Sequence, residues 1–337
     1  MKNAQINVPW LVGIKPGALE RLGLYLARSC LAPVALFHSE GLVQSILDVA
    51  RQSLGDHGVA AAPLHEVKEA SVEEAVRLLG AMPSSCKVLI GVGGGKALDV
   101  AKYTASLAEL PYFAVPTSLS NDGFCSPQAS LTLEGTRRSL PTGLPEAVVV
   151  DLAVCQRAAR RLWHSGVGDL CSKFTAVWDW KLAFQRQGVP VNDLAALMSD
   201  ASVFQFMANP VSDEQGMRLL ATALMLNGVA MEIAGSSRPA SGSEHLISHA
   251  LDMSGARQAA PRPPDGEGSL PRQQPAERQP PRENRGGCSR EQASGNPSER
   301  SPFPKRNGGL LWNEHLRLKR SFTRFSPTGM CGQSWPG

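Results

Sequence analysis

Short apolar runs and helical periods alternate along the first 150 residues of the chain. The apolar runs predict strands over residues 33–37, 87–91, 112–115 and 147–150. The helical spacing of apolar residues predicts helices over residues 19–27, 42–54, 72–79 and 97–107. Ser71 and Glu74 have the spacing of a capping box, and Glu134-Gly135 predicts the turn of a hairpin over residues 129–140. This alternation is typical of a doubly wound α/β sheet.

After Asp151 the pattern becomes helical. The apolar spacing predicts helices over residues 152–163, 167–184, 193–208, 214–234 and 243–253. The periodicity stops near Ala256. We therefore expect an α/β domain over residues 1–152, an incomplete all-α domain over residues 153–255 and a disordered tail over residues 256–337.

Composition separates the tail from the rest of the chain. Residues 1–255 hold 20 Lys and Arg against 23 Asp and Glu, whereas residues 256–337 hold 14 against 7. The tail also has 12 prolines and no Ile or Val, so it offers too little apolar surface to offset its ordering entropy. Because the part expected to fold is slightly acidic, the charge argues against a nucleic-acid binder.

No run of about 18 apolar residues predicts a membrane-spanning helix. The N-terminus has no apolar run of the signal-peptide kind, and the seven cysteines form no CxxC pair. We expect a soluble, cytoplasmic protein with reduced thiols and no membrane insertion.

The glycine run Gly91-Val92-Gly93-Gly94-Gly95-Lys96 lies between a predicted strand and a predicted helix. Backbone amides at a helix N-terminus bind phosphate, and glycines let a ligand approach closely. The run fits neither the G-x-G-x-x-G pattern nor a Walker loop. In its position between strand and helix it predicts phosphate binding, with a glycine-rich turn without ligand as the alternative. Asp99, one turn into the helix, either faces the nucleotide or is a surface carboxylate.

A polar loop over residues 116–127 follows the next buried strand. Ligands of open α/β sheets bind beyond the carboxyl ends of the strands. The hydroxyls, amide and carboxylate of this loop suit a polyol or a ribose, although an ordinary polar loop has a similar composition. Its candidate residues are Thr117, Ser118, Asp122 and Ser126.

Two further segments carry candidate metal or substrate ligands. Gly166-Val167-Gly168-Asp169 precedes the predicted helix body, so Asp169 either interacts with the helix dipole or is a metal ligand. His245 and His249 are four residues apart and share one helical face, which suits two zinc ligands, or one ligand and one substrate contact. Glu244 precedes His245, so the pattern is not HExxH. Arg137 and Arg138 are expected on a solvated hairpin face, with phosphate binding as the alternative.

Together these segments resemble the sn-glycerol-1-phosphate dehydrogenases of the iron-containing alcohol dehydrogenase and dehydroquinate synthase-like superfamily. The resemblance runs from about residue 10 to residue 255. The following motifs carry it: GVGGGKALDVAKY at 91–103, PTSLSNDGFCSP at 116–127, RRSLPTGLPEAVVVDL at 137–152, GVGDLCSKFTAVWDWKLA at 166–183 and SGSEHLISHALD at 241–252.

The resemblance implies an N-terminal dinucleotide-binding domain, a C-terminal all-α domain and a site between them. It implies reduction of dihydroxyacetone phosphate by NADH or NADPH, assisted by Zn²⁺ or alternatively Ni²⁺ or Fe²⁺, in membrane-lipid synthesis. The sequence does not separate NAD from NADP, and we also consider a homo-oligomer. The implied cofactor contacts are Gly93, Gly94, Gly95, Lys96, Asp99, Thr117, Ser118 and Ser126. The implied metal ligands are Asp169 and His245, and the implied substrate contacts are Asp122 and His249.

The sequence departs from the family after residue 255. The family places another metal-ligating His about 15–20 residues beyond His245, yet no His occurs between His249 and His315. The tail is either the product of a shifted reading frame or a genuine basic extension. With two protein ligands we expect weak metal binding and impaired turnover.

Two other readings remain open. One is a glycerol or polyol dehydrogenase, or a cyclase of the dehydroquinate synthase type, within the same superfamily. The other is an inactive nucleotide-binding protein whose basic tail binds acidic partners, which strongly salt-dependent binding would reveal.

Overall fold

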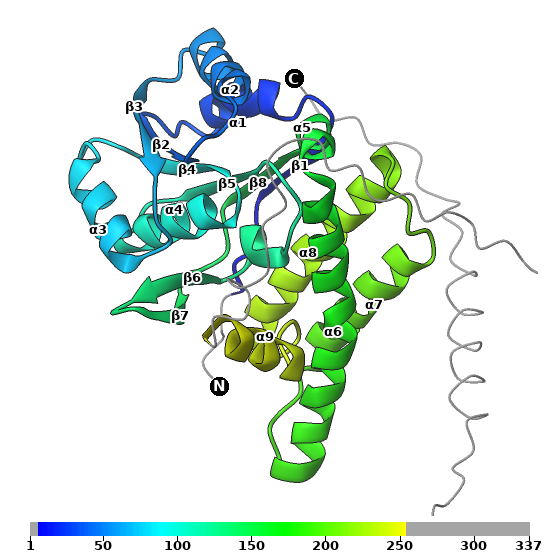
Figure 1. Ribbon diagram of the computed structural model, residues 1–337. Helices are drawn as coiled ribbons and strands as arrows, with labels where there is room; N and C mark the ends of the chain where they lie inside the picture. The colour runs from blue at the N-terminus through cyan, green and yellow to red at the C-terminus, as the bar shows by residue number, and fades with distance from the viewer. Residues whose placement is uncertain (1–5, 254–337) are drawn as a thin grey trace, which may run out of the picture. The chain divides into compact units, whose positions relative to one another are not determined.

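The structure is a computed structural model that describes residues 6–253. Six parallel strands form its main sheet in the order β1-β8-β5-β4-β2-β3 (Figure 1). They are β1 (Leu11–Lys15), β2 (Val34–Ser39), β3 (Ala61–Val67), β4 (Val88–Gly93), β5 (Tyr112–Pro116) and β8 (Ala147–Asp151). The predicted tail lies outside the described residues.

Helices cover both faces of this sheet, which confirms the predicted doubly wound arrangement. These helices are η1 (Leu19–Arg21), α1 (Leu22–Arg28), α2 (Gln44–Asp56), α3 (Val72–Ala81) and α4 (Gly95–Leu107). Side chains alternate along β2, so Leu36 packs in one core with α1 and α2. Its neighbour Phe37 points the other way and packs with α3 and α4. The central strands β4, β5 and β8 are buried on both sides, as is typical of parallel sheets.

The sequence pattern did not predict β1 and β3, the two strands at the edges of the sheet. Strand β1 is only partly buried and is interrupted by Gly13. Strand β3 begins Ala61-Ala62-Pro63, which lacks β-branched residues, and it pairs only with β2. Pairing with a neighbour, and not local propensity, makes these segments strands.

The capping box at the start of α3 is only half formed. The Ser71 hydroxyl accepts a hydrogen bond from the Glu74 amide at 3.1 Å, as predicted. The Glu74 carboxylate, however, accepts from the Lys68 amide and pairs with Arg77. In a complete capping box the Glu74 carboxylate would accept a hydrogen bond from the Ser71 amide. Here it accepts one from the preceding loop instead.

The second half of the described chain is helical. It contains α5 (Leu152–Arg157), α6 (Arg160–Gln187), α7 (Asp193–Met207), α8 (Glu214–Ala234) and α9 (Ser243–Met253). The predicted bounds of α8 and α9 are confirmed. The predicted break before residue 167 is wrong, because α6 runs without interruption through Gly166 and Gly168. The break comes instead near Ala158 and Ala159, between α5 and α6.

The helical half packs directly against the sheet. Val148 and Val150 of β8 share a buried cluster with Leu170 of α6 and Leu220 of α8. All described residues belong to one compact unit of the chain. Helix α8 is long and apolar enough to cross a membrane by length and composition, but 56% of its apolar window is buried inside the protein.

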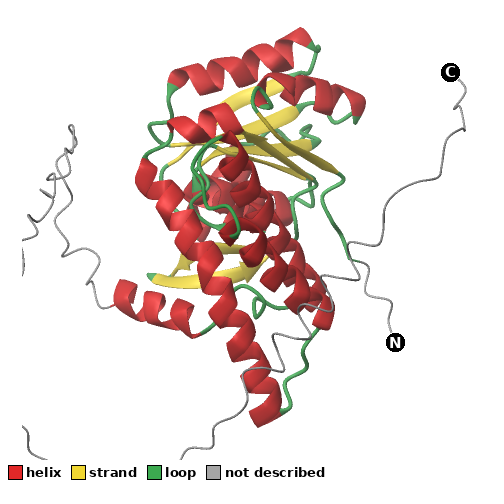
Figure 2. Cartoon of the chain, turned by 90° about the vertical axis from the view of Figure 1, so that its right-hand side faces the viewer, coloured by secondary structure: helices red, strands yellow, loops and turns green. Residues whose placement is uncertain are grey.

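The predicted hairpin is confirmed as β6 (Gln128–Leu133) and β7 (Thr136–Pro141), paired antiparallel. Both views show it set apart from the six-stranded sheet (Figures 1 and 2). A short helix η2 (Asp122–Cys125) connects the end of β5 to this hairpin.

Candidate active site

The glycine loop lies at the carboxyl end of β4, next to the end of β2. Gly93 has a φ of 142°, and a Cβ there would lie 2.1 Å from the Ser39 hydroxyl oxygen. The Gly94 amide donates a hydrogen bond to that hydroxyl at 3.0 Å. Helix α4 then begins at Gly95 without a side-chain cap, and no atom lies within 4 Å of a Cβ built on Gly94. The loop therefore has the backbone and the open space that phosphate binding requires.

Lys96 contacts the segments that follow β2 and β3. Its ammonium group donates to the Lys68 carbonyl oxygen at 2.6 Å and lies 3.3 Å from Glu40. Contact of Lys96 with a cofactor, like that of the half-buried Thr117 and Ser118, stays a prediction.

A cavity of about 660 Å³, which we call the central cavity, brings several candidates together. The predicted residues that line it are Asp99, Asp122, Ser126, Asp169 and His245. Gly93, Gly94, Gly95, Lys96, Thr117 and Ser118 are not among its lining residues. His249 lies on α9, but its side chain is outside what the structure describes.

The loop that carries Asp122 and Ser126 is held by a buried lysine that the sequence reasoning missed. The Lys102 ammonium donates to the carbonyl oxygens of Gly123 and Ser126 at 2.8 and 3.0 Å. It also lies 3.4 Å from the Asp99 carboxylate. The signal was present in the sequence, because Lys102 follows Asp99 by three residues and so lies beside it on α4.

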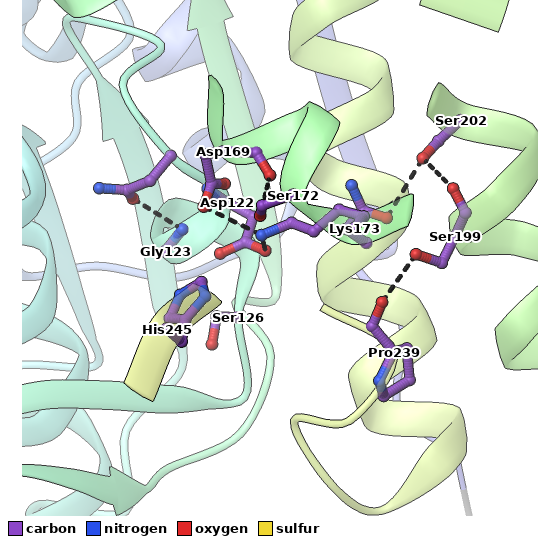
Figure 3. A network of polar contacts seen from close by, with 12 residues as sticks. Asp122, Gly123, Ser126, Asp169, Ser172, Lys173, Ser199, Ser202, Pro239 and His245 are labelled. Carbon is purple, nitrogen blue, oxygen red and sulfur yellow. Dashed lines mark hydrogen bonds and ion pairs between the residues drawn. The ribbon is translucent and has the colours of Figure 1, made fainter. Parts of the chain in front are cut away.

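A second buried lysine joins two of the predicted carboxylates. The Lys173 ammonium lies 2.9 Å from Asp122 and 3.0 Å from Asp169, and its side chain is fully buried. The Asp122 amide also donates to the Asp169 carboxylate at 3.1 Å. Figure 3 shows Lys173 reaching both carboxylates from α6. Lys173 follows Asp169 by four residues, a helical spacing that pointed to this pair.

The ion pairs outweigh the cost of burying this charge. Desolvation lowers the pKa of Lys173, but the negative charges of Asp122 and Asp169 more than compensate and raise it. Lys173 therefore stays protonated at neutral pH. Desolvation and the neighbouring Asp122 raise the pKa of Asp169, although Lys173 opposes this rise.

Asp169 does not begin a helix, as the sequence suggested, but lies within α6. Gly166, one turn earlier, lets α6 approach the loop after β5, because a Cβ there would lie 2.0 Å from the Leu119 carbonyl oxygen. This close backbone approach brings Asp169 against the Asp122 amide. Gly166 thus serves helix packing and not a helix start, whereas Gly168 has open space at its Cβ position.

His245 enters the cavity from the first turn of α9. Its Nδ1 lies 3.0 Å from the Glu244 carboxylate, which also accepts from the Gly242 amide. The Ser243 amide donates to Asp179 of α6 at 2.7 Å, which anchors the start of α9. A carboxylate beside Nδ1 fixes the orientation of the imidazole ring.

The described residues do not complete the implied metal site. Asp169 and His245 are two donors in one cavity, but both Asp169 oxygens are engaged, by Lys173 and by the Asp122 amide. Among the side chains that the structure describes, which exclude His249, no group of three His, Cys, Asp or Glu residues is placed to hold a metal ion. Protein zinc sites need three or four such ligands.

Asp99 and Arg137 complete the cavity on the side of the hairpin. Burial raises the pKa of Asp99, and the positive charges of Lys102 and Arg137 offset part of that rise. Asp99 is 8% exposed and lines the cavity. The alternative that it is a surface carboxylate is therefore wrong. Arg137 is exposed, as expected for the hairpin face, and it also lines the cavity, so the alternative of phosphate binding stays open.

Comparison with known proteins identifies the family and the fold. Residues 13–159 match the family model of iron-containing alcohol dehydrogenases. Solved structures show the same fold. A glycerol dehydrogenase from Schizosaccharomyces pombe has a TM-score of 0.57 at 21% identity, covering 69% of this chain and 63% of its own. A probable glycerol dehydrogenase from Sinorhizobium meliloti 1021 has a TM-score of 0.59 at 22% identity, covering 69% and 68%.

Curated relatives are more similar in sequence. A glycerol-1-phosphate dehydrogenase [NAD(P)+] from Thermofilum pendens is 38% identical over 252 residues, which are 73% of this chain and 72% of the relative. That of Pyrococcus furiosus is 42% identical over 192 residues, and the match spans 56% of its length. The chain belongs to the glycerol-1-phosphate dehydrogenase family of iron-containing alcohol dehydrogenases.

Proposed function

We propose that the chain binds NAD(P)H and reduces dihydroxyacetone phosphate to sn-glycerol 1-phosphate, in a reversible and slow reaction. The observation that carries this proposal is the convergence of Asp122, Asp169 and His245 on one cavity, in a chain of this family. A volume of about 660 Å³ has room for a nicotinamide ring and a three-carbon substrate together.

The cofactor binds with its pyrophosphate at the start of α4. The Gly93–Gly95 turn and the uncapped helix N-terminus supply backbone amides, and the positive end of the helix dipole favours an anion there. Asp99, one helical turn beyond Gly95, and Ser126, in the loop after β5, both line the cavity. They then contact the nicotinamide half of the cofactor. The nicotinamide, when bound, supplies the hydride.

The substrate is oriented by the carboxylates of the cavity. Asp122 accepts a hydrogen bond from a substrate hydroxyl, and its ion pair with Lys173 fixes the direction of the carboxylate. His245 and its partner Glu244 line the same cavity. We assign proton transfer at the C2 oxygen to His249, which follows His245 by one helical turn.

We derive no step through a metal ion, because the described residues provide an incomplete ligand set. We therefore expect turnover to be slow. Dihydroxyacetone phosphate polarised only by hydrogen bonds lacks the Lewis-acid stabilisation of the developing alkoxide.

The test is NADH oxidation by the purified full chain, followed at 340 nm with dihydroxyacetone phosphate, with stereochemical analysis of the product. The proposal expects substrate-dependent oxidation that yields sn-glycerol 1-phosphate and falls by about 100-fold in Asp122→Asn. Equal rates in wild type and Asp122→Asn, with both proteins folded, would refute it. Equal activity on glycerol and on its phosphate would favour a polyol dehydrogenase instead.

A further inference from the structure

The β6–β7 hairpin has one apolar face and one polar face. Ala129 and Leu131 are fully buried in the core that contains α3 and α4. The alternate residues of β6, Gln128, Ser130 and Thr132, point the other way, as alternation along a strand requires. Four hairpin residues of this second face line the central cavity: Gln128, Ser130, Arg137 and Ser139.

Strand pairing groups the polar side chains of this face. Ser130 and Ser139 are direct cross-strand partners, so their hydroxyls lie side by side. Arg137 is the partner of Thr132, one step along the same face. Its Nε donates to the Ser130 hydroxyl at 2.8 Å, which fixes one edge of the guanidinium group.

The other edge of the guanidinium group remains available to a ligand. A guanidinium group carries five N–H donors, and among the described residues the Nη atoms of Arg137 have no hydrogen-bond acceptor. Arg137 is exposed, in contrast to the buried Lys102 and Lys173. A ligand in the cavity can therefore reach it without displacing a protein partner.

The charges around the cavity make this position distinctive. Asp99, Asp122, Asp169 and Glu244 all line the cavity and repel an anion. Arg137 is the one Lys or Arg among its described lining residues. A phosphate monoester can therefore bind favourably only with its dianion at the hairpin side, where two hydroxyls flank the guanidinium group.

We propose that Arg137, together with Ser130 and Ser139, forms a phosphate-binding subsite of the central cavity. The proposal rests on the proposed function, which requires a phosphorylated ligand in this cavity. The phosphate comes either from the triose substrate or from the dinucleotide. The triose is favoured because the Gly93–Gly95 loop, assigned to the pyrophosphate, is not part of the cavity lining.

The neighbouring Arg138 is a matched control. It is the cross-strand partner of Leu131, so it belongs to the other face of the hairpin, and it does not line the cavity. Both arginines are exposed, so replacing either one changes the net charge equally and costs little stability.

The experiment compares the full-length wild type with Arg137→Gln, Arg137→Lys and Arg138→Gln. Isothermal titration measures binding of sn-glycerol 1-phosphate, glycerol, inorganic phosphate, NADH and NADPH, and denaturation midpoints confirm folding. We expect Arg137→Gln to weaken the binding of glycerol 1-phosphate and of inorganic phosphate about tenfold or more, and to leave the binding of glycerol unchanged. Arg137→Lys recovers part of the loss, and Arg138→Gln matches the wild type.

The arms of the experiment separate the two phosphate sources. If Arg137→Gln loses affinity only for glycerol 1-phosphate and inorganic phosphate, the subsite belongs to the triose. If it loses affinity for NADPH but not for NADH, the subsite belongs to the cofactor. Unchanged phosphate binding in Arg137→Gln, or an equal loss in Arg138→Gln, overturns the proposal. If the wild type binds no NADH, the proposed function fails, while the inorganic phosphate arm still tests the subsite.

Discussion

The ammonium group of Lys173 lies 2.9 Å from the carboxylate of Asp122, which belongs to a loop that is distant in sequence. This contact joins α6 of the helical half to the loop that follows β5 of the sheet. The lysine is fully buried, and both carboxylates that it contacts are mostly buried as well. The ion pairs therefore stabilise the relative position of the two halves.

Removing the Lys173 charge is expected to destabilise the protein strongly. Lys173→Met leaves Asp122 and Asp169 buried without a counter-ion, which costs about 3–5 kcal/mol. Urea denaturation at pH 7 measures this loss. The control is Lys181→Met on the same helix, because its ion pair with Asp200 is exposed and is expected to contribute less than about 1 kcal/mol. Similar losses in the two variants would contradict the role given to Lys173.

Two glycines of one helical segment are expected to respond in opposite directions to alanine. Gly166→Ala forces α6 away from the Leu119 carbonyl oxygen and destabilises the protein by about 1–3 kcal/mol or more. Gly168 has open space at its Cβ position, so Gly168→Ala is expected to stabilise helix α6 by about 0.5 kcal/mol. Thermal unfolding of both variants checks the pair. A tolerated Gly166→Ala would mean that α6 does not need this close approach.

Glu74 is expected to contribute an acid-sensitive part of the stability. The hydrogen bond from Arg77 lowers the pKa of Glu74 below its ordinary value of 4.5, although burial opposes this shift. A depressed carboxylate pKa stabilises the fold above the unfolded value and loses that contribution as pH falls through the folded value. Glu74→Gln should therefore cost about 1 kcal/mol at pH 7 and little at pH 3. Denaturation at both pH values tests this, and a pH-independent loss would contradict it.

Metal binding by the full chain is expected to be weak. Asp169 and His245 are the only predicted metal ligands that line the cavity, and Lys173 already engages one Asp169 oxygen. After dialysis the purified chain should retain far less than one zinc ion per molecule, and His245→Ala should not change that amount. Elemental analysis measures it. One tightly held zinc per chain, lost in His245→Ala, would show that a further ligand completes the site.

Much of the fold was predictable because its core strands and helices have clear periodicity. The central strands are apolar throughout, and the bounds of α8 and α9 match the pattern of apolar residues. The edge strands β1 and β3 were not predictable, since pairing with β8 and β2 makes them strands. The continuity of α6 through Gly166 was also hidden, because it depends on a contact with Leu119.

The candidate site was predictable in its carboxylates and histidine but not in its cations. Asp122, Asp169 and His245 follow from motifs, and the structure brings them to one cavity. The roles of Lys102 and Lys173 depend on which loop packs against each helix face, which no local pattern encodes. Arg137 is exposed, as expected for an arginine on a hairpin, but its place at the cavity depends on the tertiary arrangement and could not be predicted.

The central claim is that the cavity binds a nicotinamide cofactor together with a phosphorylated three-carbon ligand. The most direct measurement is calorimetric titration of the full chain with NADH, and then of that complex with sn-glycerol 1-phosphate or glycerol. This combination allows no hydride transfer, so it reports binding alone. The account predicts that NADH binds and that glycerol 1-phosphate then binds at least about tenfold tighter than glycerol. A folded chain that binds no NADH, or binds both ligands equally, would contradict it.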